Sequence, residues 1–246
     1  MVRSIIINDD IAHHYFISRD DDGTYRGRSA GSGRPAASPC PSARGVSCCA
    51  SYNQIRERHM IQEKPSVAVV VPVYKAQLSR EEQISLQQLQ RVLGDYPKIF
   101  FAPEGLDFDY GELMQGFRIE RFPAVYFSGF LGYSLLMLSV GFYQRFLAYD
   151  YILVYQLDAF VFHDALPQFC AMGYDYIGAP VYRCAPCWHA AGVQVGNGDF
   201  SLRRTAACLR LVQEQHDLLL HHPLQASFRE CEDLFFAYCG GQQETA

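Results

Sequence analysis

The chain has 246 residues, of which 49% are hydrophobic and 19% are charged, and its formal net charge at pH 7 is -5. This describes a globular protein with one sizeable core, and the acidic balance without a basic cluster argues against a nucleic-acid binder. The most apolar region, residues 122–146, contains Gln144 and Arg145, so we interpret it as a buried helix and predict no transmembrane segment. Because the N-terminus shows no signal peptide, we predict a cytoplasmic protein.

Residues 1–59 lack the patterning of a folded domain. Residues 26–44 are mainly Gly, Ser, Pro, Ala and Arg, and such a segment cannot bury enough surface to offset its ordering entropy. The apolar positions at residues 4–7 and 15–17 could form a short strand or helix, isolated from the rest. We predict that residues 1–59 are a disordered or atypical leader and that residues 60–246 form a single domain.

The chain has nine cysteines, an odd number, and shows no export signal, so we expect reduced thiols. Cys184 and Cys187 have the two-residue spacing of a zinc or redox pair. A structural zinc site would need a second such pair, and the later cysteines do not form one. We interpret the pair as part of a loop, with a metal or redox role as the alternative.

A regular alternation of elements begins after residue 60. Residues 66–73 are a β-branched run typical of a strand buried on both faces. Ser79 and Glu82 form the pattern of a capping box that opens a helix, and Gly94 ends it. Residues 98–102 supply a second strand, so the order of strand, helix and strand predicts a right-handed parallel crossover.

The alternation continues to about residue 182. We predict an exposed strand at 117–122, a helix at 130–147, a buried strand at 151–157, a short helix at 164–172 and a strand at 175–182. A helix resumes at residues 204–220. The fold class is therefore α/β with a mostly parallel central sheet flanked by helices.

Asp158 lies where the buried strand at residues 151–157 ends. An isolated carboxylate there is costly to desolvate unless a charged or hydrogen-bonding group meets it, and ligands bind at the carboxyl ends of strands in open α/β sheets. Asp158 could instead cap the next turn. The strand alone leaves both interpretations open.

Two later segments also combine polar residues with flexible or aromatic neighbours. Residues 195–204 place two glycines around Asn197, which would let a ligand approach the backbone, although Asn-Gly is also a strong hairpin signal. In residues 228–238, Glu232 and Asp233 precede an aromatic run. Acidic residues in the first turn of a helix are also favoured by the macrodipole alone.

Four segments together resemble a known family. Residues 149–158, 174–180, 196–203 and 232–236 are similar to an uncharacterised family of bacterial and fungal proteins that is grouped with GT-A-type nucleotide-sugar glycosyltransferases. The resemblance covers about residues 65–238. It implies a Rossmann-like GT-A fold, and because related chains run further, it also implies a C-terminally shortened domain.

The resemblance implies a nucleotide-sugar donor at the carboxyl ends of the strands. The residues implied for donor binding follow the first and the central strand: Pro72, Tyr74, Lys75, Gln156 and Asp158. Asp158 falls where such enzymes have a metal-binding Asp-x-Asp element, which implies a divalent cation, Mn²⁺ or Mg²⁺. This chain has one carboxylate there where two are usual, which puts the metal in doubt.

The remaining implied residues surround the sugar and the acceptor. Gly196, Asn197, Gly198 and Asp199 resemble a Gly-rich turn beside the donor sugar. Glu232 and Asp233 lie where inverting enzymes carry the carboxylate that takes a proton from the acceptor hydroxyl, and Asp233 is slightly preferred.

Two function classes follow. The first is a metal-assisted, inverting glycosyltransferase, hexosyltransferase-like, that moves a sugar from a nucleotide-diphosphate donor to a glycan or other hydroxyl acceptor. The alternative is a non-catalytic nucleotide- or glycan-binding protein on the same fold, which the single carboxylate at Asp158 favours. A nicotinamide dehydrogenase is disfavoured because no G-x-G-x-x-G follows residues 66–73.

Overall fold

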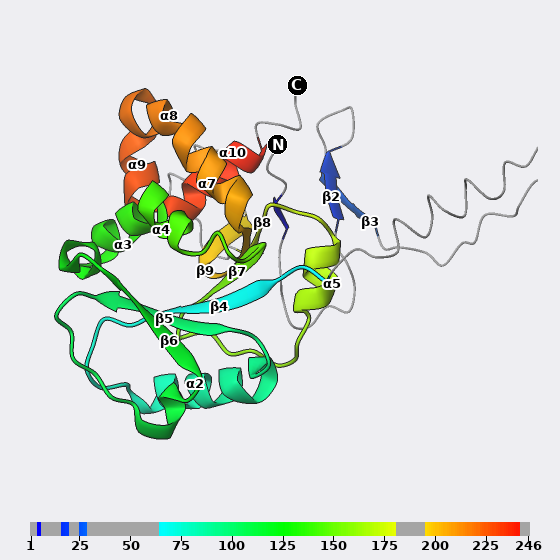
Figure 1. The fold of residues 1–246 in the computed structure, drawn as a ribbon. Coiled ribbons are helices and arrows are strands. Elements are labelled where there is room, and N and C mark those ends of the chain that lie inside the picture. The colour runs from blue at the N-terminus through cyan, green and yellow to red at the C-terminus, as the bar shows by residue number, and fades with distance from the viewer. Residues whose placement is uncertain (1–3, 6–15, 20–24, 29–63, 181–194, 242–246) are drawn as a thin grey trace, which may run out of the picture. The chain divides into compact units, whose positions relative to one another are not determined.

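The computed structural model describes residues 4–5, 16–19, 25–28, 64–180 and 195–241 (Figure 1). The chain divides into two compact units, one made of Met1–Asn8 and Pro65–Ala246 and the other of Asp9–Lys64. In the second unit, strands β2 (Phe16–Arg19) and β3 (Tyr25–Arg28) pair in antiparallel fashion. The first unit contains the sheet and the candidate site.

A seven-stranded mixed sheet forms the centre of the first unit, in the order β1-β8-β9-β7-β4-β5-β6. Its strands are β1 (Ser4–Ile5), β4 (Val67–Pro72), β5 (Lys98–Pro103), β6 (Phe117–Phe122), β7 (Tyr151–Tyr155), β8 (Tyr176–Pro180) and β9 (Val195–Arg204). Strands β4 to β7 pair in parallel, and β9 runs antiparallel between β7 and β8. The predicted α/β class with a mostly parallel sheet is confirmed.

The central strands are buried on both faces, as their apolar runs predict. In β4, Val69 and Val71 pack on one side of the sheet and Val70 packs on the other. Strands β5 and β7 alternate in the same way. This produces two hydrophobic cores, one on each face of the sheet.

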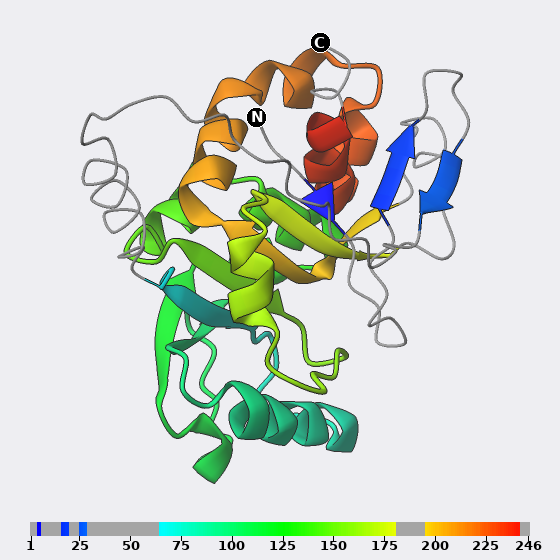
Figure 2. The ribbon, with the colours of Figure 1, turned by 90° about the vertical axis from the view of Figure 1, so that its right-hand side faces the viewer.

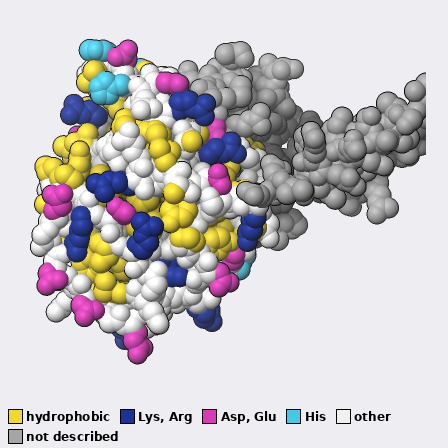
Figure 3. All heavy atoms as spheres, in the orientation of Figure 1, with side chains coloured by type: hydrophobic (Ala, Val, Ile, Leu, Met, Phe, Trp, Pro, Cys, Tyr) yellow, Lys and Arg dark blue, Asp and Glu magenta, His cyan; other side chains and the backbone are white. Residues whose placement is uncertain are grey.

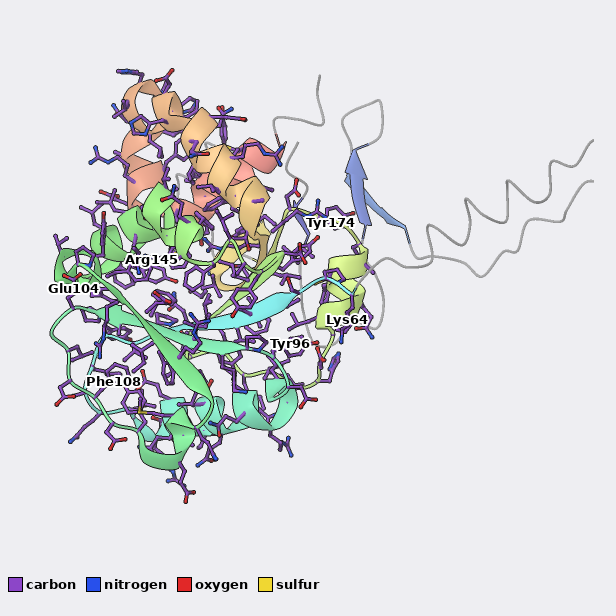
Figure 4. The ribbon with its side chains drawn as sticks, viewed as in Figure 1. Lys64, Tyr96, Glu104, Phe108, Arg145 and Tyr174 are labelled. Carbon is purple, nitrogen blue, oxygen red and sulfur yellow. The ribbon has the colours of Figure 1, made fainter. Side chains whose placement is uncertain are left out.

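Helices cover both faces (Figures 1 and 2). The helices are α2 (Arg80–Leu93), α3 (Phe130–Met137), α4 (Val140–Arg145), α5 (Leu166–Ala171), α7 (Thr205–Glu214), α8 (His216–His221), α9 (Gln225–Glu230) and α10 (Glu232–Gly241), with 3-10 turns η1 (Gly111–Met114) and η2 (Ala124–Phe127). Helices α2 and α5 contribute to one core, and α3, α4 and α7 to α10 contribute to the other. In Figure 4, Phe108 lies on the α2 side and Arg145 lies on the opposite side, where its guanidinium group stacks over Phe122.

The capping box predicted for the first helix is present. The backbone N–H of Ser79 donates to a Glu82 carboxylate oxygen at 2.7 Å, and the N–H of Glu82 donates to the Ser79 hydroxyl at 3.3 Å. Gly94 follows the last residue of α2, as expected.

The predicted helix at residues 130–147 is wrong as a single element. The helix breaks into α3 and α4 because Ser139 takes an extended backbone conformation and its hydroxyl caps α4 by accepting from the N–H of Phe142. The predicted helix at 204–220 likewise divides into α7 and α8 at Gln215.

Parts of the leader are ordered into strands. Residues 4–5, expected to be isolated, pair in parallel with β8 as strand β1. Most of residues 1–59 lie outside the described residues, as do Cys184 and Cys187. Where the chain is described, no cysteine forms a disulfide.

No described helix is both long enough and apolar enough to cross a membrane. On the face of the first unit drawn in Figure 3, basic and acidic side chains are interspersed among apolar ones. This face therefore shows no extended basic stripe of the kind that nucleic-acid binders use.

Candidate functional site

The order of strands reverses between β4 and β7. From β4 the chain adds β5 and then β6 on one side, whereas β7 pairs with the other side of β4. In open α/β sheets, ligands bind outside the carboxyl ends of the strands at such a switch point. Pro72 ends β4 at this edge, and Gln156 directly follows β7.

A cleft of about 450 Å³ lies at this switch point. Its volume falls within the range of roughly 300–1,000 Å³ that small-molecule sites occupy. The lining residues come from the ends of β4 and β7, from β9, from the η2–α3 segment and from the α9–α10 junction: Pro72, Tyr74, Phe127, Gly129, Phe130, Tyr133, Ser134, Gln156, Asp158, Asp199, Glu230, Cys231, Glu232 and Asp233.

Most of the residues singled out from the sequence meet in this cleft. Those that line it are Pro72, Tyr74, Gln156, Asp158, Asp199, Glu232 and Asp233. Lys75 lines an adjoining hollow of about 60 Å³, which shares Tyr74 and Asp158 with the cleft. Residues more than 150 positions apart in the sequence are thus brought to one edge of the sheet.

Gly196, Asn197 and Gly198 do not line the cleft, because the segment is part of strand β9 and not a separate turn. The register with β8 shifts here and leaves a bulge. A side chain at Gly198 would lie 2.8 Å from Arg203 and 3.0 Å from Glu232, and one at Gly196 would meet Ala237. These glycines therefore allow the backbone to approach its own protein neighbours, and of the four predicted residues only Asp199 reaches the cleft.

Tyr74 and Lys75 follow β4 at the mouth of the cleft. The Tyr74 side chain is 58% exposed, so its ring is available to stack on a flat ligand. Lys75 forms an ion pair with Glu82 at 2.8 Å, and its backbone carbonyl accepts from the hydroxyl of Tyr110. The ion pair raises the pKa of Lys75.

Asp158 is exposed at the end of β7, and among the described residues no group donates a hydrogen bond to its carboxylate. The turn-capping role left open by the sequence belongs instead to Asp164, whose carboxylate accepts from the N–H of Leu166. The described residues contain no group of three His, Cys, Asp or Glu side chains able to hold a metal by themselves. The predicted metal ligand Asp158 stays a prediction.

Asp199 is held beside Asp158 by the end of β7. The Gln156 backbone N–H donates to the Asp199 carbonyl at 2.9 Å, and the Gln156 amide donates to Asp199 Oδ1 at 2.8 Å. Within the described part of the chain, the other oxygen, Oδ2, has only a 3.5 Å contact with the Asn197 amide. Burial, reinforced by the charges of Glu232 and Asp158, raises the pKa of Asp199 to about 6.

Arg203 lies next to Glu232 and is completely buried. Its guanidinium carbon lies 5.2 Å from the ring centroid of Tyr176 and 5.0 Å from that of Phe236, and these two rings stack on each other. It donates to the Tyr143 hydroxyl at 3.0 Å and approaches Glu232 Oε1 at 3.4 Å. Arg203 thereby joins β9 to α4 and α10 and fixes the acids of α10 at the cleft.

Glu232 and Asp233 begin α10 and are both buried. The Ser134 hydroxyl donates to Glu232 Oε2 at 3.0 Å. Asp233 accepts from the backbone N–H groups of Gly198 and Leu234 and from the Cys231 thiol at 2.6 Å. Burial raises the pKa of both carboxyl groups, because little solvent remains to stabilise their charges.

Tyr133 was not predicted from the sequence. Its hydroxyl oxygen is buried and makes no hydrogen bond of standard geometry within the described residues, although the Gln156 side chain is close enough to interact with it. Burial raises the pKa of Tyr133 well above its usual range, so the hydroxyl keeps its proton. The many aromatic residues between positions 122 and 146 are the sequence feature that could have indicated Tyr133. Their pattern predicts a buried helix, and it does not indicate that this segment lines a cleft.

The family comparison covers the half of the chain that supplies most of this site. Residues 116–246 match the family described as "Protein of unknown function (DUF5672)". The chain belongs to this family. The part that matches DUF5672 runs from β6 through α10 and includes Gln156, Asp158, Asp199, Glu232 and Asp233, whereas β4, α2 and β5 precede it. No curated protein matches the chain.

Proposed function

We propose that the chain is a glycosyltransferase that binds a nucleotide-sugar donor in this cleft and transfers the sugar to a hydroxyl acceptor. One observation supports this most strongly: the cleft lies at the strand-order reversal and brings Tyr74 and Asp158 together with the acids Asp199, Glu232 and Asp233. A GT-A arrangement would place the nucleotide near Tyr74 and Asp158 and the acceptor near one of these acids.

The residues that line the cleft are acidic, and their negative charges disfavour the binding of a diphosphate on its own. The lining contains five carboxylates, and no Lys, Arg or His occurs among its described residues. Two negative phosphates would be repelled there without a countercharge. The donor is therefore expected to bind together with a cation.

Asp158 fits such a cation in its chemistry. Mg²⁺ is commonly bound by one or two carboxylates together with substrate phosphates, and the Asp158 carboxylate is exposed without a protein partner among the described residues. A bound divalent cation would supply positive charge that offsets the diphosphate as it departs. Asp158 would hold the cation and orient the donor, while Tyr74 would stack on the base.

The chemistry of the protein itself is proton removal from the acceptor. As the acceptor oxygen bonds to the anomeric carbon, the bond from that carbon to the diphosphate oxygen breaks and the electron pair leaves with the nucleoside diphosphate. The acceptor proton passes to a carboxylate of the cleft, and such a base contributes roughly 10²- to 10⁴-fold in rate. Attack on the face opposite the leaving group gives inversion.

A second candidate is a non-catalytic nucleotide- or glycan-binding protein. It is favoured by the lack of a three-ligand metal group among the described residues. Such a protein would bind the nucleotide or glycan without releasing a product.

Thermal unfolding with a panel of nucleoside diphosphates and nucleotide sugars, each with and without Mn²⁺, tests donor binding. A ligand at about a hundred times its Kd should add roughly 2.7 kcal/mol, which is several degrees in Tm. We expect a metal-dependent shift that Asp158→Asn removes and that Asp217→Asn, at an exposed acid of α8 outside the cleft, retains. The absence of a shift with every nucleotide would contradict a donor site.

A further inference from the structure

The carboxylates of Glu232, Asp233 and Asp199 differ in how many of their oxygens already accept hydrogen bonds or form an ion pair within the protein. One Glu232 oxygen faces Arg203, and the other lies 3.0 Å from the Ser134 hydroxyl, which is equally close to the Glu230 carbonyl oxygen. Taking up a proton would weaken its pairing with the fully buried Arg203, which would then lie uncompensated in the core. Glu232 is therefore suited to anchoring α10.

Asp233 is similarly engaged. Its Oδ2 accepts from the Gly198 N–H at 3.2 Å, and its Oδ1 accepts from the Leu234 N–H at 2.9 Å and from the Cys231 thiol at 2.6 Å. Hydrogen bonds to a carboxylate favour its charged form and occupy the lone pairs that would receive a proton. A substrate proton would have to displace one of these donors.

One carboxylate oxygen of Asp199 accepts a hydrogen bond from Gln156, and the other is available to receive a proton from a ligand. The Gln156 amide fixes Oδ1 at 2.8 Å, whereas among the described residues Oδ2 has only the 3.5 Å contact with Asn197. The side chain is partly exposed and lines the cleft. It is also close enough to both Asp158 and Glu232 to interact with their charges.

We propose that Asp199 is the carboxylate that receives the acceptor proton, a role that rests on the proposed transferase function. The acceptor O–H bond breaks as the acceptor oxygen bonds to the anomeric carbon, its proton joins Asp199 Oδ2, and the nucleoside diphosphate leaves with the electron pair of the broken C–O bond. Gln156 is the positioning residue that orients the carboxylate. Glu232 and Asp233 keep α10 and the β9 bulge in place.

The surroundings of Asp199 suit this role. Glu232 and Asp233 face it from α10, Asp158 from the end of β7 and Arg203 from β9 itself. Burial raises the pKa of Asp199, whereas Arg203 lowers it, and the charge of Asp158 adds to the rise only while no cation is bound to that carboxylate.

The test compares Asp199→Asn with Asp233→Asn, using the nucleotide sugar that gives the largest thermal shift and a hydroxyl acceptor. We expect kcat/KM of the unmodified protein to fall about tenfold per pH unit at acidic pH, where a carboxylate base becomes protonated. Asp199→Asn should lose at least about 100-fold in kcat/KM and lose this acidic limb, while its Tm shift with the nucleoside diphosphate and Mn²⁺ is retained. Asp233→Asn should retain the acidic limb even where its rate falls.

Two results would overturn the assignment while leaving the transferase intact. One is an acidic limb that survives in Asp199→Asn and disappears in Asp233→Asn. The other is loss of the nucleotide-induced Tm shift in Asp199→Asn, which would make Asp199 a donor ligand. If the unmodified protein transfers no sugar and binds no nucleotide, the proposed function itself fails, and the role of Asp199 fails with it.

Discussion

Replacing Asp199 by Asn should stabilise the protein at alkaline pH. In the folded protein, burial first and the charges of Glu232 and Asp158 next raise the pKa of this carboxyl group from 3.8 to about 6. A charge that is disfavoured in the folded state reduces the free energy of unfolding. Asparagine removes the charge, and its side-chain oxygen can still accept from the Gln156 amide.

The magnitude follows from the difference between the two pKa values. A shift of one unit corresponds to 1.36 kcal/mol, so the full penalty is about 3 kcal/mol above about pH 6, before discounting for partial exposure. Because the folded pKa is raised, the penalty is absent below about pH 4 and grows as the pH rises towards 6. Asp199→Asn should therefore raise the unfolding free energy by about 1–3 kcal/mol at pH 8, and by about half as much at pH 5.

Urea denaturation at pH 5 and pH 8 measures this difference directly. Asp217→Asn is the matched control, since it removes an exposed charge outside the cleft and should change stability little at either pH. An Asp199→Asn protein that is less stable than the unmodified protein at pH 8 would refute the reasoning. So would a gain that is equal at both pH values.

Three further variants test other parts of the structure by denaturation. Tyr133→Phe removes a buried hydroxyl that makes no hydrogen bond of standard geometry among the described residues, so it should be neutral or stabilise by up to about 1 kcal/mol; a loss above 1 kcal/mol would show that its interaction with Gln156 is a hydrogen bond. Glu232→Ala should destabilise by about 3–5 kcal/mol because it leaves the buried Arg203 unpaired, and a loss below about 1 kcal/mol would mean that water or another group compensates it. Ser79→Ala should cost about 1 kcal/mol through loss of the α2 cap, and an unchanged midpoint would argue against that cap.

The sequence predicted those parts of the fold that depend on local patterns. The β-branched run of β4 and the apolar run of β7 determine strands buried on both faces, because each side of the sheet needs its own apolar residues. The Ser79 capping box fixes the start of α2 through hydrogen bonds within one turn. Such features need no knowledge of distant contacts.

Features that depend on distant contacts were missed. The glycines of β9 were interpreted as a turn beside a ligand, but they are required by Arg203, Glu232 and Ala237, which approach them from elsewhere in the chain. The break between α3 and α4 follows a single serine inside an apolar stretch. Phe130 and Tyr133 line the cleft because α3 packs against α9 and α10, which lie far from it in the sequence.

The candidate site was predictable as a set of residues but not in its division of roles. The position of Asp158 at the end of a buried strand and of Glu232 and Asp233 before an aromatic run indicated polar groups that needed partners. The pairing of Glu232 with Arg203 could not be read from the sequence, because Arg203 looked like one of two adjacent arginines on a strand. That contact is the reason why we propose that Glu232 anchors α10 and that another carboxylate is the base.

Transfer itself is the most direct test of the proposed function. The protein would be incubated with the nucleotide sugar that gives the largest thermal shift, with Mn²⁺ and with a set of simple sugar and alcohol acceptors, and the products followed by mass spectrometry. We predict an acceptor whose mass rises by one sugar residue, one nucleoside diphosphate released per product, and no product with Asp158→Asn. Nucleotide binding without any glycosylated product or released diphosphate would contradict the transferase and leave a binding protein.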